Sequence, residues 1–362
     1  MIETFTLLSA FIALLSIFKE IKHKNTVFWS FTVLLIIFDG LRWEMGTDWH
    51  SYYTYFSVAT DLNVYGGFEF GYRLYTTLIR SVTDNYSIYL LVTTAIIYVG
   101  IFYTVFKVTN HSFISMFYLA GTIPWYSGSL RQMMACVFFT LALKACIEKK
   151  FTYFLLLMIF GLAFHTTIIV FIPMYWLYGM SSSLFLLLFI ALAVLSIFSR
   201  NLIYLLDVLA NFFSFNKSFL SRLGGTLDTS NPLLGFCRKF LTIGGFIGFS
   251  LIANTSPLIN RLQWKTIKFT LSLVSLSVIL YYIGTYHINY VSSRVDIYIS
   301  IISASVLIGV LDKAFTKRGN RLLLYFFVTA LLGVFYYRLG LMDLFHPYTS
   351  LFYNNDFKRD LH

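Results

Sequence analysis

The chain has 362 residues, of which 58% are hydrophobic and only 12% are charged, about half of the charge that a soluble domain carries. Its apolar residues fall in runs of roughly 15 to 20 residues separated by short polar breaks, which is the spacing that a lipid bilayer imposes. This composition excludes a soluble enzyme and predicts an all-α, polytopic integral membrane protein. Because the apolar runs are continuous rather than alternating, an outer-membrane barrel is not expected.

We expect about twelve transmembrane helices in a single integral membrane domain that covers residues 1–362. The apolar runs that predict them lie near 2–18, 26–41, 87–106, 112–127, 131–147, 151–163, 165–179, 183–199, 239–253, 266–285, 293–311 and 321–338. Two long polar segments, near 42–86 and 200–238, predict large loops. Residues 201–213 have the pattern of an amphipathic helix that lies on a membrane surface.

Lysine and arginine are distributed differently between the two faces that these spans define. Lysine concentrates on one face, in the short segments 19–24, 107, 148–150, 261–268 and 312–318. By the positive-inside rule this face is cytoplasmic, so both termini and both long loops lie outside. The other face holds most of the acids together with ten arginines. Because arginine binds phosphate and carboxylate in a bidentate way, this sorting indicates that the outer face handles an anion. Arginines that only snorkel and pair with nearby acids would give the same pattern.

The first polar cluster of the outer face is the stretch RWEMGTDWHSYYTYF (42–56), continued by GGFEFGYRLYTTLIR (66–80). Its candidate site residues are Arg42, Asp48, Tyr52, Glu69, Tyr72 and Arg73. Charged groups beside hydrocarbon cost several kcal/mol unless they face water or a partner. The stretch is therefore either a solvated loop or part of a site at the membrane surface.

The second cluster is WYSGSLRQMMACVFF (125–139), in which Arg131 and Gln132 open a long helix. An arginine in the first turn of a helix is unfavourable with the helix dipole unless an anion also sits there. Backbone N–H groups and a guanidinium together make a suitable pocket for phosphate. The cluster predicts an anion site.

The remaining polar groups are sparse. His165, in GLAFHTTIIVFIPMYW (161–176), is the only Asp, Glu, Lys, Arg or His between Lys150 and Arg200. A buried histidine is often structural, but polar groups within a membrane tend to mark function. In YHINYVSSRVDIY (286–298), Arg294 and Asp296 are two residues apart and cannot face each other on a helix, so Arg294 should bind another partner, such as a lipid phosphate.

Several chemical signatures are absent. The sequence has no Gly-rich nucleotide loop, no HExxH motif and no Cys/His metal set, and the lack of a DxD-like pair argues against a nucleotide-sugar donor. The three cysteines, Cys136, Cys146 and Cys237, have neither a disulfide nor a metal spacing and are interpreted as packing residues.

In chain order these clusters resemble those of the EpsG-like, Wzy-type polysaccharide (O-antigen) polymerases. The residues that carry the resemblance are Arg42, Gly46, Thr47, Asp48, Trp49, Tyr52, Phe56, Glu69, Tyr72, Leu74, Arg131, Gln132, Ala135, Phe164, His165, Arg294, Pro347 and Tyr348. The resemblance covers nearly the whole chain. Trp49 stands where such proteins often have another aromatic residue, and Glu44 adds an acid that the pattern does not include.

The resemblance implies a GT-C-like membrane glycosyltransferase of the bacterial inner membrane, with its active site facing the periplasm. Such an enzyme transfers a lipid pyrophosphate-linked glycan chain onto the next undecaprenyl pyrophosphate-linked repeat unit. It implies no metal and no other cofactor. The implied partners are this lipid-linked oligosaccharide, membrane lipids, a Wzz-type chain-length regulator and a Wzx-type flippase, and not nucleic acid.

The site residues divide according to this reaction. Arg131 and Arg294 would hold the pyrophosphate, assisted by Arg42 or Arg73. The base that accepts the proton of the acceptor hydroxyl would be His165, Glu69 or Asp48, of which the first two are favoured. Gln132, Tyr52, Tyr72 and Tyr348 would bind substrate, with aromatic rings stacking on sugar faces.

Two other activities remain open. An O-antigen ligase would use the same donor with a lipid A-core acceptor, and the sequence does not separate it from a polymerase. A flippase should carry polar groups at mid-membrane, often within paired repeats, whereas these clusters lie at one face. A non-catalytic membrane scaffold gives no reason for the separation of arginine from lysine.

Overall fold

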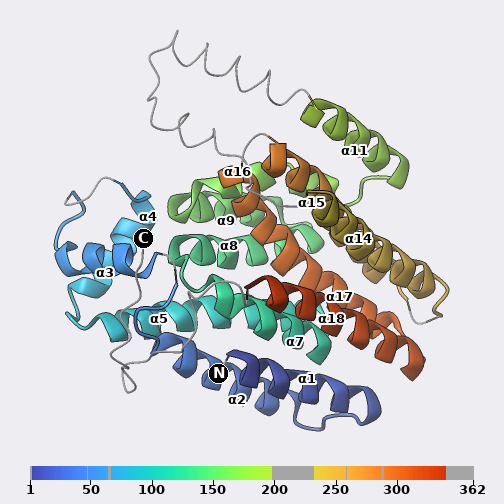
Figure 1. Ribbon diagram of the computed structural model, residues 1–362, viewed down its shortest axis with the longest axis horizontal. Helices are drawn as coiled ribbons and strands as arrows, with labels where there is room; N and C mark the ends of the chain where they lie inside the picture. The colour runs from blue at the N-terminus through green and yellow to red at the C-terminus, as the bar shows by residue number, and fades with distance from the viewer. Residues whose placement is uncertain are drawn as a thin grey trace. The chain divides into compact units, whose positions relative to one another are not determined.

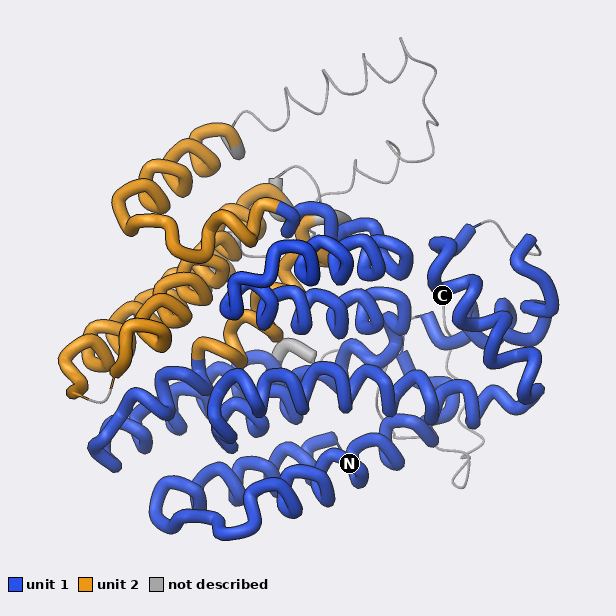
Figure 2. Tube along the Cα trace, turned by 180° about the vertical axis from the view of Figure 1, so that it is seen from behind, with its two compact units in different colours: residues 1–172, 308–362 blue, residues 173–307 orange. Residues whose placement is uncertain are grey.

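The computed structural model describes residues 2–46, 48–63, 67–197, 232–257, 259–286 and 289–339, and the elements over these ranges are all helices (Figure 1). The chain divides into two compact units (Figure 2). Unit 1 comprises residues 1–172 and 308–362, and unit 2 comprises residues 173–307. The all-α prediction is confirmed.

Unit 1 is built mainly from the N-terminal half of the chain. Its helices are α1 (Ile2–Phe18), α2 (Lys24–Gly40), α3 (Trp49–Val58), α4 (Phe70–Arg80), α5 (Tyr86–Tyr98), the π-helix η1 (Val99–Tyr103), α6 (Thr104–Val108), α7 (Phe113–Thr122), the 3₁₀ helix η2 (Ile123–Tyr126), α8 (Leu130–Ile147), α9 (Phe151–Phe164), the 3₁₀ helix η3 (Thr166–Phe171) and α18 (Arg318–Leu339). The last seven residues of α17 (Ala304–Ala314) also belong to it.

Unit 2 has fewer elements. They are α10 (Met174–Leu177), α11 (Ser182–Ile197), α14 (Pro232–Asn254), α15 (Arg261–Tyr286), α16 (Asn289–Ile297), the π-helix η4 (Tyr298–Ser303) and the start of α17. Helix α15 packs against α14, α16 and α11. An ion pair between Lys239 Nζ and Asp296 Oδ2, 2.9 Å long, joins α14 to α16.

The expectation of about twelve crossings is wrong. Within the described ranges, six helices are long and apolar enough to cross a membrane: 86–108, 130–147, 235–254, 261–283, 292–314 and 318–337. The chain is thus a multi-pass membrane protein, but several apolar runs form helices too short for a bilayer that needs about 20 residues. Shorter apolar helices cover Ile2–Phe18, Phe151–Phe164, Thr166–Leu177 and Ser182–Leu195.

Local sequence explains why these runs break. The predicted span 112–127 stops as an α-helix at Thr122 and continues as a 3₁₀ turn that contains Pro124, because proline cannot donate to a helical ladder. The predicted span 165–179 is a 3₁₀ helix followed by one short turn that begins after Pro173. Apolar composition marked these segments correctly, but it does not set the length of a helix.

The two long polar segments have different outcomes. Residues 42–86 contain α3 and α4 rather than one continuous loop. Of the segment 200–238, residues 232–238 form the start of α14. The amphipathic stretch 201–213 and the tail from residue 340 lie outside the described residues.

Helix α8 is largely buried in unit 1, with close neighbours in α9, α5 and η1. Small residues on its buried faces, such as Ala135, Cys136 and Ala142, let neighbouring backbones approach, as is typical of membrane helices. Cys136 and Cys146 are both buried and free, in line with a packing role.

Gly309→Ala tests how closely α17 packs in unit 1. A Cβ built at Gly309 would lie 2.5 Å from the Thr109 Cβ and 3.0 Å from the Ser115 Cβ, so α17 would have to move away. We expect a loss of about 1–3 kcal/mol in the free energy of unfolding, measured in detergent. The matched control is Gly333→Ala in α18, where a Cβ meets nothing within 4 Å and alanine favours the helix. Equal stability of the two variants would contradict this packing.

Candidate functional site

Four candidate residues lie at helix ends that unit 1 brings to one place. Arg42 follows α2, Glu69 precedes α4, Arg131 lies in the first turn of α8, and His165 ends α9. The contacts described below connect these helix ends to one another. We call Arg131, Glu69, Tyr52 and Phe68 the arginine cluster.

The centre of this cluster is an ion pair between Arg131 and Glu69. Arg131 Nη1 donates to Glu69 Oε2 at 2.6 Å, and the two side chains remain 20% and 16% exposed. The guanidinium carbon lies 4.5 Å from the centre of the Phe68 ring, within the range of a cation–π contact. The Tyr52 phenol also interacts electrostatically with the Arg131 guanidinium. Three separate parts of the chain therefore meet at one guanidinium.

The carboxylate of Glu69 resolves the dipole conflict that the sequence posed at Arg131. An arginine in the first turn of a helix requires a nearby anion, and Glu69 supplies it. The pair is only partly buried, so a phosphate with a stronger charge could replace the carboxylate on the same guanidinium. The arrangement is suited to exchanging an internal anion for a ligand anion.

Tyrosines form the wall behind the pair. Ring centres of Tyr52 and Tyr72 are 5.5 Å apart, and Phe68 packs edge-on against Tyr72 at 5.4 Å. Burial raises the pKa of both Tyr52 and Tyr72, so both phenols stay protonated at neutral pH and can donate hydrogen bonds. Tyr72 is fully buried, and its hydroxyl accepts a 2.8 Å bond from Tyr89, so it supports Tyr52 from the core.

Arg42 lies in a buried network beneath the cluster and is 2% exposed. Its Nη1 is 3.2 Å from Asp39 Oδ1 and donates to the Asp39 carbonyl at 2.6 Å, while Nη2 donates to the Ser127 carbonyl at 2.8 Å. These bonds tie the end of α2 to the turn that precedes α8. Arg42 therefore anchors the turn from which α8, with Arg131 in its first turn, begins.

A glycine contact reinforces this tie. Gly46 has φ +94°, a value that L side chains rarely adopt, and a Cβ there would lie 2.5 Å from the Gly128 Cα. The loop after α2 is thus pressed directly onto the backbone of the turn before α8. Only glycine satisfies both the conformation and the close approach.

His165 ends α9, and α9 packs against α4, the helix that follows Glu69. The His165 backbone is extended at the end of α9, and Nδ1 is 2.8 Å from Thr167 Oγ1, so the ring caps the 3₁₀ helix η3. Helix α4 packs against the last turn of α9, since a Cβ at Gly71 would lie 2.7 Å from the Ala163 carbonyl oxygen. Tyr75 also packs edge-on against Phe164, with 6.2 Å between ring centres. His165 is 6% exposed.

The other predicted site residues lie in different settings. Asp48 is half-buried just before α3, one turn from Tyr52, whose pKa its charge raises. Arg73 donates to the Leu62 carbonyl at 2.7 Å, and Gln132 is buried in α8. Arg294 is half-buried in α16, which belongs to unit 2, and Tyr348 lies outside the described residues.

Sequence reasoning missed two residues of this region. Phe68 packs on the guanidinium of Arg131, and Asp39 neutralises Arg42. The spacing of Asp39 and Arg42, three residues apart at the end of a helix, was a signal that could have identified the second. In the described part of the chain, no three His, Cys, Asp or Glu side chains gather as metal ligands would.

A comparison with protein families confirms the family resemblance that the sequence predicts. The family model described as the EpsG family matches residues 25–350, nearly the whole chain. The stretch contains the entire arginine cluster. No curated protein and no solved structure matches the chain.

Arg42→Met tests the buried network. The substitution leaves the buried Asp39 carboxylate without its cation, and we expect a loss of about 3–5 kcal/mol in the free energy of unfolding. Adding Asp39→Asn should recover part of the loss, because the uncompensated charge is removed. Arg80→Met is the control, since Arg80 pairs with an Asp84 that is 88% exposed and should cost at most about 1 kcal/mol. Similar losses in the two single variants, measured in detergent, would contradict the network.

Proposed function

The chain belongs to the EpsG family, and we propose from that premise that it is a polysaccharide polymerase of the bacterial inner membrane. Membership of the family indicates a role in exopolysaccharide biosynthesis, and the six candidate spans indicate a multi-pass membrane protein. The polymerase activity, its substrates and the roles of individual residues are our proposal.

In the proposed reaction, a glycan chain leaves its undecaprenyl pyrophosphate and joins the next lipid-linked repeat unit. The bond between the anomeric carbon and the pyrophosphate oxygen breaks, and a glycosidic bond to the acceptor hydroxyl forms. The acceptor proton passes to a base, and undecaprenyl pyrophosphate departs. The enzyme must therefore stabilise an anionic leaving group, accept a proton and align two large substrates.

The observation that carries the proposal is the half-buried pair of Arg131 and Glu69. A pyrophosphate that binds Arg131 would displace the Glu69 carboxylate from the guanidinium. The displaced carboxylate would then be available, beside the leaving group, to take the proton of the acceptor hydroxyl. The protonated Tyr52 phenol would donate to a sugar or phosphate oxygen.

His165 and Asp48 are the alternative bases. The packing of α4 on the end of α9 puts His165 on the element next to Glu69, and Asp48 lies one turn from Tyr52. We propose that Gln132, Arg73 and Arg42 act indirectly, by supporting Arg131 and the tyrosines that pack behind it. Roles for Arg294 and Tyr348 in substrate binding, and assembly with Wzz-type and Wzx-type partners, are further parts of the proposal.

The end of unit 1 with the arginine cluster would face the periplasm. Three helical segments of unit 1 have a lysine near the end away from the cluster. These are Lys24 at the start of α2, Lys107 in α6, which continues α5 and η1, and Lys144 in the last turn of α8. By the positive-inside rule these lysines favour the cytoplasm.

Arg131→Ala tests the proposal in cells that lack the gene and carry a plasmid copy. We expect surface sugar reduced to a single repeat, because loss of the pyrophosphate partner should slow transfer at least about 10²-fold. Arg80→Ala is the matched control and should restore full-length polymer. Complete loss of surface sugar in the deletion strain would point instead to a flippase or ligase. Normal chain length with Arg131→Ala, at normal protein level, would remove the pyrophosphate assignment.

Glu69→Gln and His165→Gln distinguish the two favoured bases. The variant that lacks the base should lose at least about 10²-fold in rate while still binding the lipid-linked donor. We expect this result for Glu69→Gln, and a smaller loss for His165→Gln, whose ring caps η3. The measurement is the rate of chain growth with purified variants at several pH values. A flat response to both substitutions would exclude both bases and leave Asp48.

A further inference from the structure

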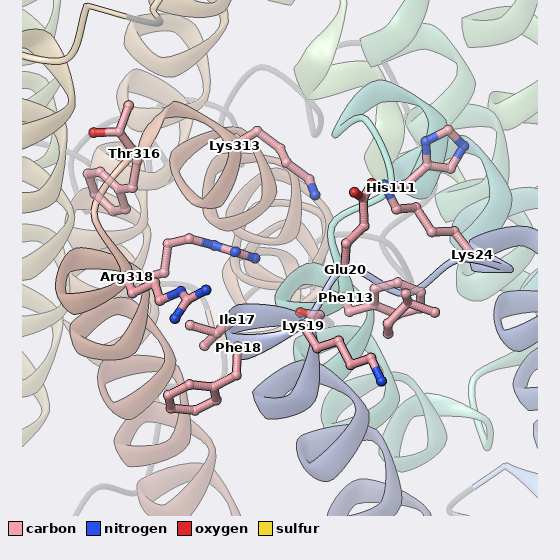
Figure 3. Close-up of a pocket in the computed structure, with 14 residues that line it drawn as sticks. Ile17, Phe18, Lys19, Glu20, Lys24, His111, Phe113, Lys313, Thr316 and Arg318 are labelled. Carbon is pink, nitrogen blue, oxygen red and sulfur yellow. Dashed lines mark hydrogen bonds and ion pairs between the residues drawn. The ribbon is translucent and has the colours of Figure 1, made fainter.

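Unit 1 contains a second charged site, at the lysine-rich end. A pocket of about 350 Å³ lies among the end of α1, the loop before α7, the end of α17 and the start of α18 (Figure 3). Its lining includes five cations: Lys19, Lys24, Lys313, Arg318 and Arg321. The arginine cluster of the proposed active site contributes no residue to it.

Only part of this positive charge is neutralised within the protein. Glu20 Oε1 accepts from Lys24 Nζ at 2.8 Å, and the fully buried Asp312 accepts from Arg321 Nε at 2.7 Å. Lys313 Nζ lies 4.0 Å from the same Asp312. Five cations thus face two carboxylates, which leaves an excess of three positive charges around one cavity.

Asp312 acts as the frame of this pocket. Its Oδ2 accepts a 2.8 Å bond from the Ser112 hydroxyl, while its Oδ1 holds Arg321. The carboxylate therefore connects the start of α7, the end of α17 and the first turn of α18. Its position is fixed by these bonds, so it orients Arg321 toward the pocket without meeting a ligand itself.

Two cations remain for a ligand. Lys19 and Arg318 are exposed, and neither side chain has a hydrogen-bond or ion-pair partner among the described residues. His111 also lines the pocket, and its Nε2 is a buried atom without a hydrogen-bond partner in the described structure. Burial and the neighbouring lysines lower the pKa of His111, so its imidazole stays neutral and adds no charge.

The rest of the lining is apolar. Ile17, Phe18, Phe113 and Phe315 contribute hydrocarbon beside the cations. Such a combination of several cations with an apolar wall fits a phosphate that is attached to an organic group. Basic pockets between membrane helices recognise anionic headgroups by this chemistry.

We propose that this pocket is a binding site for an anionic phosphate group, held by Lys19 and Arg318 against the Arg321–Asp312 frame. The phosphate belongs either to the headgroup of an anionic phospholipid or to a soluble phosphate compound. The site is independent of the proposed transfer reaction, because it rests on residues at the other end of unit 1.

The test measures binding to the purified full-length protein in detergent by native mass spectrometry. The probes are short-chain phosphatidylglycerol, zwitterionic short-chain phosphatidylcholine and inorganic phosphate. We expect one tight molecule of phosphatidylglycerol or of phosphate per chain, and no equivalent for phosphatidylcholine. Lys19→Gln/Arg318→Gln should weaken this binding roughly tenfold or more.

The matched control is Lys149→Gln/Lys150→Gln, which removes two charges after α8 from residues that do not line the pocket. It should bind as the wild type does. Phosphatidylglycerol binding assigns the site to a membrane lipid, and binding of inorganic phosphate alone assigns it to a soluble compound. Failure of the wild-type protein to bind either anion would overturn the proposal, as would an equal loss in both double variants.

Discussion

The ion pair between Arg131 and Glu69 organises one end of unit 1, because it joins residues that are 62 positions apart in the chain. A charge next to membrane hydrocarbon must find a partner or water. Arg131 finds a carboxylate, a phenol and an aromatic face, and each comes from a segment outside α8. These contacts hold the two short helices α3 and α4 next to the start of α8.

A second pair makes this arrangement rigid. Arg42 and Asp39 are buried and partner each other, and Arg42 also binds the backbone at Ser127. Partial exposure distinguishes the two pairs. The Arg42 and Asp39 side chains are 2% and 7% exposed, whereas the Arg131 and Glu69 side chains are 20% and 16% exposed. Only the Arg131 pair is therefore partly open to solvent, and we propose that it alone meets a ligand.

Much of the fold was predictable from the sequence, and the errors in predicting the number of membrane crossings have physical reasons. Continuous apolar runs identified the helices at 86–108 and 130–147 within a few residues. The number of crossings was overestimated, because apolar composition alone does not show where a helix ends. Near Pro124 the α-helix gives way to a 3₁₀ helix although the run remains apolar.

The site was predictable only in its residue types. The dipole conflict at Arg131 indicated a nearby anion, but a pair separated by so many residues leaves no periodic signal, so Glu69 could not be identified as that anion. The burial of Arg42 was equally hidden, since it depends on the carbonyl of Ser127 and on the approach of Gly46 to Gly128. The structural role of Tyr72 follows from contacts with Tyr89 and Phe68 that no local pattern encodes.

We propose that this chain by itself joins lipid pyrophosphate-linked repeat units. The most direct measurement reconstitutes the purified wild-type protein in proteoliposomes with undecaprenyl pyrophosphate-linked repeat units, without nucleotide sugar, and follows chain length over time. We expect chains that lengthen by whole repeats with release of undecaprenyl pyrophosphate. Repeat units that stay single, in liposomes where the protein is folded and correctly inserted, would contradict it.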